Sequence, residues 1–219
     1  MLEKRNVWLP VLLMIVFAIT RWPGLMPPNF SAAYALVFCA GIYFRNRLGW
    51  WVPLSIMVFS DLLLNLFYYI PHGWGGWKTL GYQAMNYVAY ATIFWLGHRF
   101  KQKDPFVKTV CGGLAGGIIF YLVTNTAAWL LNPFENKEYH LDWRSWFVAL
   151  TTGTSAWPGT WEFFRNTLFS AGLFTALFVA AMKYSEAAES AAEKKAANAP
   201  AEDEGEAAEP QPEESKAAS

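Results

Sequence analysis

The chain has 219 residues, of which 54% are hydrophobic and 18% aromatic, and this composition excludes a soluble domain of average make-up. The formal net charge of zero combines a basic body, with 14 Lys or Arg against 7 Asp or Glu in residues 1–184, and an acidic tail, with 3 against 10 in residues 185–219. The two cysteines and three histidines are widely spaced, which gives no support to a disulfide framework or a metal site.

Six apolar runs, separated by polar or Pro-rich breaks, predict transmembrane helices, because a helix needs about 20 residues to cross a bilayer. They cover residues 7–20, 30–44, 50–70, 80–96, 106–131 and 162–182. The first run follows a basic start, as in a signal peptide, but no small-x-small cleavage site follows it, and we expect an uncleaved span. The predicted fold is all-α: a polytopic membrane helix bundle of about six spans over residues 1–184.

Two segments depart from this pattern. Residues 143–158 are apolar but short and rich in Thr, so they could form a re-entrant or interfacial segment or a further crossing. From Ser185 onward the chain is Ala, Glu, Lys and Pro of low complexity, which cannot bury apolar surface. We expect an acidic, disordered tail over residues 185–219, with a short helical continuation to about Ala197.

The distribution of Lys and Arg predicts the orientation in the membrane. One set of alternate exposed segments carries most of these residues, in stretches 4–5, 45–47, 99–108 and from 183 onward. The other set carries four such residues. With six spans between them, both termini are expected to be cytoplasmic.

Isolated polar side chains lie in or beside the apolar runs, where they need a partner or a water-filled cavity. At a rise of about 1.5 Å per residue, Asp61 lies near the midplane of its span and the others lie further outward. This shared depth predicts one polar pocket that opens away from the cytoplasm. The candidate substrate-binding residues are Arg21, Asn29, Asp61, Asn125, Glu162, Arg165 and Asn166.

Each candidate has a purely structural alternative. Arg21 can snorkel to lipid headgroups. Glu162 and Arg165, three residues apart on one helix face, can form an ion pair that fixes the last span. Asp61 can be protonated or can pair with a residue such as Arg165. Each asparagine can be explained by a single interhelical hydrogen bond. The pairs Gly112/Gly116 and Gly113/Gly117 favour helix packing faces.

Four short motifs stand out: residues 28–31 ahead of a small-residue run, Ser60-Asp61, Thr124-Asn125 and residues 163–168. Together they resemble an uncharacterised family of small bacterial membrane proteins with six spans, which implies a location in the bacterial cytoplasmic (inner) membrane. The architecture also resembles, more weakly, the substrate-binding subunits of energy-coupling-factor transporters. These six-helix proteins bind a small molecule near the outer face and dock a partner membrane subunit through small-residue helix surfaces. That resemblance implies a docking role for Ala32 to Gly41.

We therefore expect a membrane protein that captures or transports a small molecule. Arg21 and Arg165 suit a carboxylate or phosphate on the ligand, and Asp61 suits an amine or ring nitrogen. The alternative is a structural or assembly subunit of a larger membrane complex. We expect no enzyme activity and no cofactor, since HExxH and GxSxG motifs are absent. Nucleic acid is not an expected partner, because the Lys and Arg surplus follows the membrane pattern.

Overall fold

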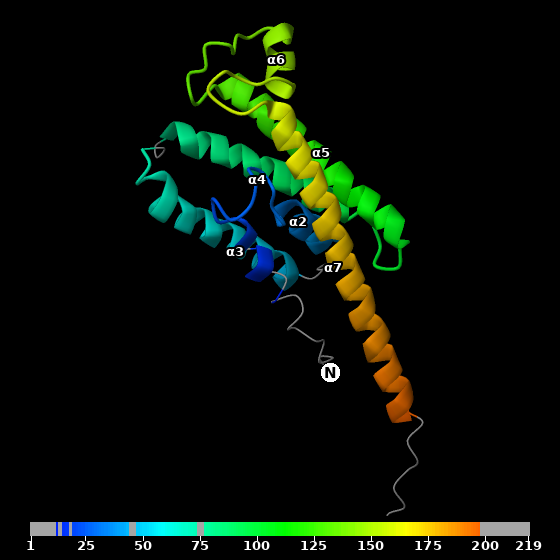
Figure 1. The fold of residues 1–219 in the computed structure, drawn as a ribbon. Coiled ribbons are helices and arrows are strands. Elements are labelled where there is room, and N and C mark those ends of the chain that lie inside the picture. The colour runs from blue at the N-terminus through cyan, green and yellow to red at the C-terminus, as the bar shows by residue number, and fades with distance from the viewer. Residues whose placement is uncertain (1–11, 13–14, 18, 44–46, 74–76, 198–219) are drawn as a thin grey trace, which may run out of the picture. The chain divides into compact units, whose positions relative to one another are not determined.

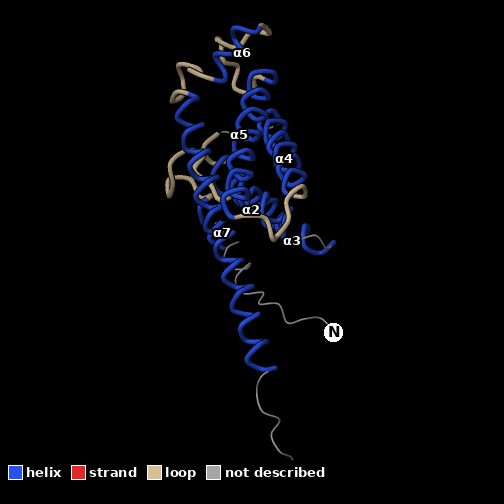
Figure 2. Tube along the Cα trace, turned by 90° about the vertical axis from the view of Figure 1, so that its right-hand side faces the viewer, coloured by secondary structure: helices blue, strands red, loops and turns tan. Residues whose placement is uncertain are grey.

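The computed structural model describes residues 12, 15–17, 19–43, 47–73 and 77–197. The chain divides into two compact units, Met1–Ser185 and Glu186–Ser219. All regular elements in the described residues are helices (Figure 1): α2 (Ala33–Tyr43), α3 (Arg47–Leu64), the π-helical turn η1 (Asn65–Tyr69), α4 (Trp77–Gly97), α5 (Phe106–Leu131), α6 (Trp143–Leu150) and α7 (Thr160–Ala197). Figure 2 shows the same helices joined by loops, with no strand in the described part of the chain.

The all-α prediction is confirmed for these residues, but the number of spans is not. By length and composition, two helical segments are able to cross a membrane, Phe106–Leu131 and Thr160–Ala191. The apolar helices Ala33–Tyr43 and Leu54–Tyr69 are shorter, and most of the predicted span at residues 7–20 lies outside the described residues. The predicted helical continuation to Ala197 is confirmed, whereas residues 198–219 of the predicted tail lie outside the described part.

The segment 143–158 contains only the short helix α6. Its eight residues extend about 12 Å, which is too short for a helical crossing of the bilayer. Asp142 caps the amino end, because its side chain accepts a hydrogen bond from the backbone N–H of Ser145 at 2.8 Å. After Thr151 the chain turns through Gly153, whose φ of +73° favours glycine. The full crossing considered for this segment is therefore excluded for a helix.

The centre of the first unit is α2. Its sequence is apolar all round, and such a helix has to be covered on every side. All of its residues are buried, and it lies beside α3, α4 and α5 (Figure 1). The small-residue run from Ala32 to Gly41 is thus covered by this chain itself, and the partner-docking role implied for it is wrong.

Glycine allows α2 and α4 to approach until their backbones touch. A Cβ atom on Gly41 would lie 2.4 Å from the carbonyl oxygen of Phe94, and one on Gly97 would lie 2.3 Å from that of Phe38. Because the obstructing atoms are backbone atoms, side-chain rearrangement cannot relieve either clash. The small residues of α2 therefore serve contact within the chain.

The glycines of α5 form two packing faces, as predicted. A Cβ on Gly113 would lie 2.1 Å from the hydroxyl oxygen of Thr175, and one on Gly117 would lie 2.9 Å from Ala171. This face packs against α7. Gly112 lies against the rings of Phe38 and Phe100 on the other side.

Replacing Gly41 by Ala should destabilise the protein by about 1–3 kcal/mol, since overpacking at a rigid contact forces backbone shifts. Gly81→Ala, also in a helix of this bundle, is the matched control, because a Cβ there meets no atom within 4 Å. The measurement is the free energy of unfolding in detergent, followed by tryptophan fluorescence. Equal stability of the two variants would contradict the close α2–α4 contact.

Candidate functional site

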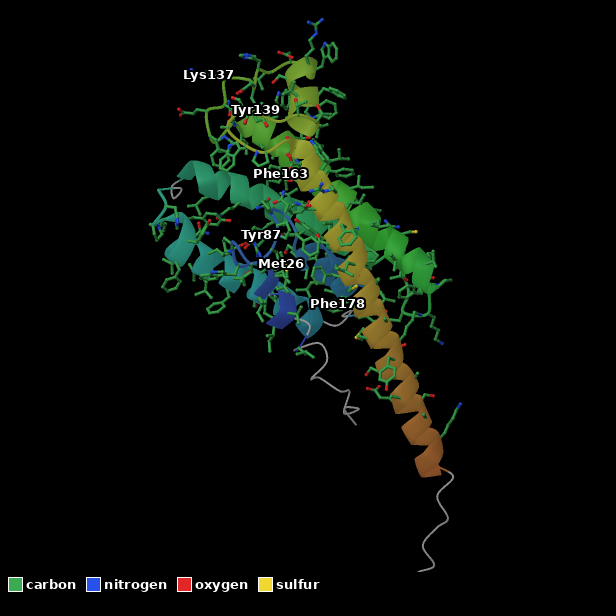
Figure 3. All side chains as sticks on the ribbon, viewed as in Figure 1. Met26, Tyr87, Lys137, Tyr139, Phe163 and Phe178 are labelled. Atoms are coloured by element: carbon green, nitrogen blue, oxygen red, sulfur yellow. The ribbon has the colours of Figure 1, made fainter. Side chains whose placement is uncertain are left out.

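A cavity of about 550 Å³ is lined by the loop before α2, by α3, α4 and α5, and by the loops on either side of α6. Figure 3 labels Met26, Tyr139 and Phe163, which line it from the loop before α2, the loop before α6 and the start of α7. The charged and amide side chains in its lining are Arg21, Asn29, Asp61, Gln83, Asn86, Asn125 and Asn136. Cavities of this size hold small organic molecules.

An ion pair lies in the cavity wall. Arg21 donates through Nη2 to Oδ1 of Asp61, and through Nη1 to the Ser60 hydroxyl at 2.9 Å. The second carboxylate oxygen of Asp61 accepts from the hydroxyl of Tyr87 at 2.5 Å. The side chains of Arg21 and Asp61 are only 14% and 16% exposed, so each charge is poorly hydrated and is stabilised by the opposite charge of its partner.

Two side-chain amides join η1, which directly follows α3, to α4. Asn65 donates to the side-chain oxygen of Gln83 at 3.0 Å, and Gln83 donates back to that of Asn65 at 3.2 Å. Asn65 opens the π-helical turn η1, and such turns are frequent at functional sites. Tyr68 and Tyr69, both within η1, line the cavity.

One face of α4 supplies polar groups that the sequence analysis did not select. Gln83, Asn86, Tyr87 and Tyr90 follow the spacing of a single helix face, and three of them line the cavity. The signal that could have found them is this polar and aromatic stripe within an otherwise apolar helix. Tyr90 is only 7% exposed, and its hydroxyl has no hydrogen-bond partner among the described residues.

Aromatic rings form much of the remaining lining. The Phe120 ring lies 4.6 Å from that of Tyr34 and stacks on Tyr90 at 5.2 Å, measured between centroids. In the loops on the other side, Phe134 and Trp157 are 5.9 Å apart. The cavity therefore combines flat apolar surfaces with a few polar groups, as small-molecule sites do.

The loop at residues 21–31, which forms part of the cavity wall, is held in place by several contacts besides the ion pair. The backbone carbonyl of Pro28 accepts from the side-chain amide of Asn166 at 3.0 Å, and that of Asn29 accepts from the Tyr34 hydroxyl at 3.0 Å. Asn29 itself has a φ of +59°, a conformation that asparagine tolerates better than most residues.

Four of the seven predicted site residues come together. Arg21, Asn29, Asp61 and Asn125 line the cavity, whereas Glu162, Arg165 and Asn166 do not. Asn166 instead fixes the neighbouring loop through Pro28.

The alternatives considered for the charged residues are resolved as well. In the described part of the chain Glu162 and Arg165 form no ion pair, and the Arg165 guanidinium lies 5.3 Å from the Trp161 ring. The partner of Asp61 is Arg21, and not Arg165. Because Arg21 is held in this pair, it does not snorkel.

A second contact joins the two loops around α6. The hydroxyl and the backbone N–H of Ser155 donate to Oε1 of Glu138 at 2.7 and 3.1 Å. These bonds, with the hydroxyl contributing most, hold the pKa of Glu138 below its ordinary value. The loops before and after α6 both line the cavity, so this contact fixes part of its wall.

These features define a helical protein with a polar, aromatic-lined cavity beside its most buried helix. The chain matches a family of unknown function (DUF6580) over residues 2–194. It therefore belongs to this family, in agreement with the uncharacterised family suggested by its motifs. Comparisons with curated proteins and with solved structures find no match.

Asp61→Asn should lower the free energy of unfolding by about 3 kcal/mol, because it leaves Arg21 as an uncompensated buried charge. The double variant Arg21→Gln/Asp61→Asn removes both charges and should be more stable than the single variant. A denaturant titration of four proteins, the native chain, Asp61→Asn, Arg21→Gln and the double variant, measures this coupling. Simple additivity of the two single substitutions would show that the charges do not interact.

The Glu138 contact predicts a pH dependence. Because its pKa is lowered by folding, the stabilisation is complete above the ordinary glutamate pKa and is lost as pH falls through the folded value. Ser155→Ala should therefore lower the thermal denaturation temperature more at pH 7 than at pH 3. A pH-independent difference would mean that Glu138 is not the group involved.

Proposed function

We propose that the protein is an integral membrane protein that binds a small molecule in this cavity, as the substrate-capturing component of a transport system. The observation that carries the proposal is the cavity of about 550 Å³, in which polar groups and aromatic rings converge from segments far apart in the chain. Its size and its combination of polar groups with aromatic rings are those of small-molecule sites, and a purely structural subunit has no need of such a combination.

The distribution of polarity supports a membrane setting. Large apolar side chains are exposed along α3, α5 and α7, including Phe59 at 61%, Val107 at 70% and Phe169 at 65%. The Arg21–Asp61 pair lies inside. Apolar side chains outside and ionic groups inside are typical of a chain surrounded by lipid.

The orientation is supported by the position of the basic residues. The loop that carries Arg99, Lys101 and Lys103 precedes α5, and Lys183 donates to the backbone carbonyl of Asp104 in this loop at 3.1 Å. These basic residues therefore share one end of the first unit, which the positive-inside rule assigns to the cytoplasm.

The cavity lies toward the other end of α5. This helix has 26 residues and extends about 39 Å, and its lining residues, from Phe120 to Ala128, all lie in the half remote from the basic loop. We place the protein in a bacterial inner membrane, in several spans with both termini cytoplasmic. The cavity then opens away from the cytoplasm.

The proposed ligand-binding role is tested by native mass spectrometry of the full chain, gently extracted from its own membrane. A retained small molecule is expected, and Asn125→Ala should lower its occupancy about tenfold by removing a hydrogen-bonding group from the cavity wall. Arg165→Ala is the control, because Arg165 lies outside the lining. A protein that carries a partner subunit but no small molecule would instead favour an assembly role.

A further inference from the structure

The first step toward the chemical class of the ligand is the charge of the cavity. Of its lining residues, Arg21 and Asp61 are the only ones with formally charged side chains at pH 7. They neutralise each other within one ion pair. The cavity therefore presents ionic groups but no net charge.

The second step is that the two charges are already paired with each other. Both oxygens of Asp61 accept hydrogen bonds, from Arg21 and Tyr87, and both terminal nitrogens of Arg21 donate, to Asp61 and Ser60. A charged ligand that replaced either partner would leave the other charge unpaired in a poorly hydrated site, which is strongly unfavourable. A charged ligand that bound beside the intact pair would meet no net charge to offset the loss of its own hydration.

The third step concerns the groups that remain available. The Tyr90 hydroxyl and the Asn86 amide have no partners among the described residues, although Tyr90 is buried and both line the cavity. The Asn125 amide nitrogen donates within its own helix to the carbonyl of Tyr121, which leaves its oxygen as an acceptor. An amide or a hydroxyl offers both a donor and an acceptor, so these groups suit a ligand edge that carries both.

The aromatic lining complements this edge. Among the rings of the lining, those of Phe134 and Trp157, with centroids 5.9 Å apart, belong to residues that are 44% and 42% exposed, and aromatic faces stack favourably on other rings. We propose that the cavity selects an uncharged, planar ring compound whose edge carries both hydrogen-bond donors and acceptors. This inference rests on the proposed function and replaces the carboxylate, phosphate or amine ligand that Arg21 and Asp61 individually suggest.

Three probes on one ring scaffold test the inference: quinoline-4-carboxamide, which is neutral, quinoline-4-carboxylate, which is an anion, and 4-(aminomethyl)quinoline, which is a cation at pH 7. Equilibrium dialysis against the full chain in lipid nanodiscs gives the three dissociation constants. The carboxamide should bind at least about tenfold more tightly than either charged probe.

Two variants locate the origin of this preference. Asp61→Asn leaves the cavity with one net positive charge and should improve carboxylate binding, relative to carboxamide, by about tenfold. Arg21→Gln/Asp61→Asn restores neutrality and should restore the preference for the carboxamide. Arg165→Gln, which removes a charge outside the lining, should leave the ratio unchanged.

The outcomes separate the two proposals. Tighter binding of the carboxylate or the ammonium probe to the native protein, or an unchanged ratio in a folded Asp61→Asn variant, would overturn the neutral-ligand inference and leave the binding function standing. If the native protein bound none of the probes and retained no molecule from its own membrane, both would be overturned. A retained molecule with a net charge would overturn the inference alone.

Discussion

The buried ion pair between Arg21 and Asp61 is the constraint on which the site depends. The two residues are 40 positions apart in the chain, and neither charge is tolerable in this environment without the other. Their pairing brings the loop at residues 21–31 against α3, and this loop is one wall of the cavity. Tyr87, on α4, donates a hydrogen bond to the second oxygen of the Asp61 carboxylate. The contact that neutralises two charges therefore also assembles three of the surfaces that a ligand would meet.

Around this site the helices pack closely because glycines, which have no side chain, lie at their contacts. Gly41 and Gly97 allow α2 and α4 to touch backbone to backbone, and Gly113 and Gly117 seat α7 on α5. Close backbone contact gains dispersion and weak polar contacts without large apolar side chains. The hydroxyls of Thr167 and Thr175 are buried on this face of α7 without a hydrogen-bond partner among the described residues.

Much of the helical layout was predictable, and the site was predictable in part. Helix α5 matches its apolar run at both ends, because polar or Pro-containing segments bound it sharply. Position along the apolar runs grouped Arg21, Asn29, Asp61 and Asn125, since rise per residue is fixed by helix geometry, and all four line the cavity. Rotation about the helix axis is set by packing and cannot be read from the sequence, and Glu162 and Arg165, which were grouped with them, lie outside the lining. The same limit hid Tyr87 and Tyr90, and it left α2 to be interpreted as an outer docking surface when it is the most buried helix.

The ion pair also restricts how sequences of this family can diverge. A change at position 21 or 61 alone leaves a buried charge without its partner, whereas a joint change to two neutral side chains does not. The two positions are therefore expected to change together, although 39 residues separate them in the chain. Homologues that lack the aspartate should lack the arginine too, and such paired losses would mark the members of the family whose cavity has taken up a different chemistry.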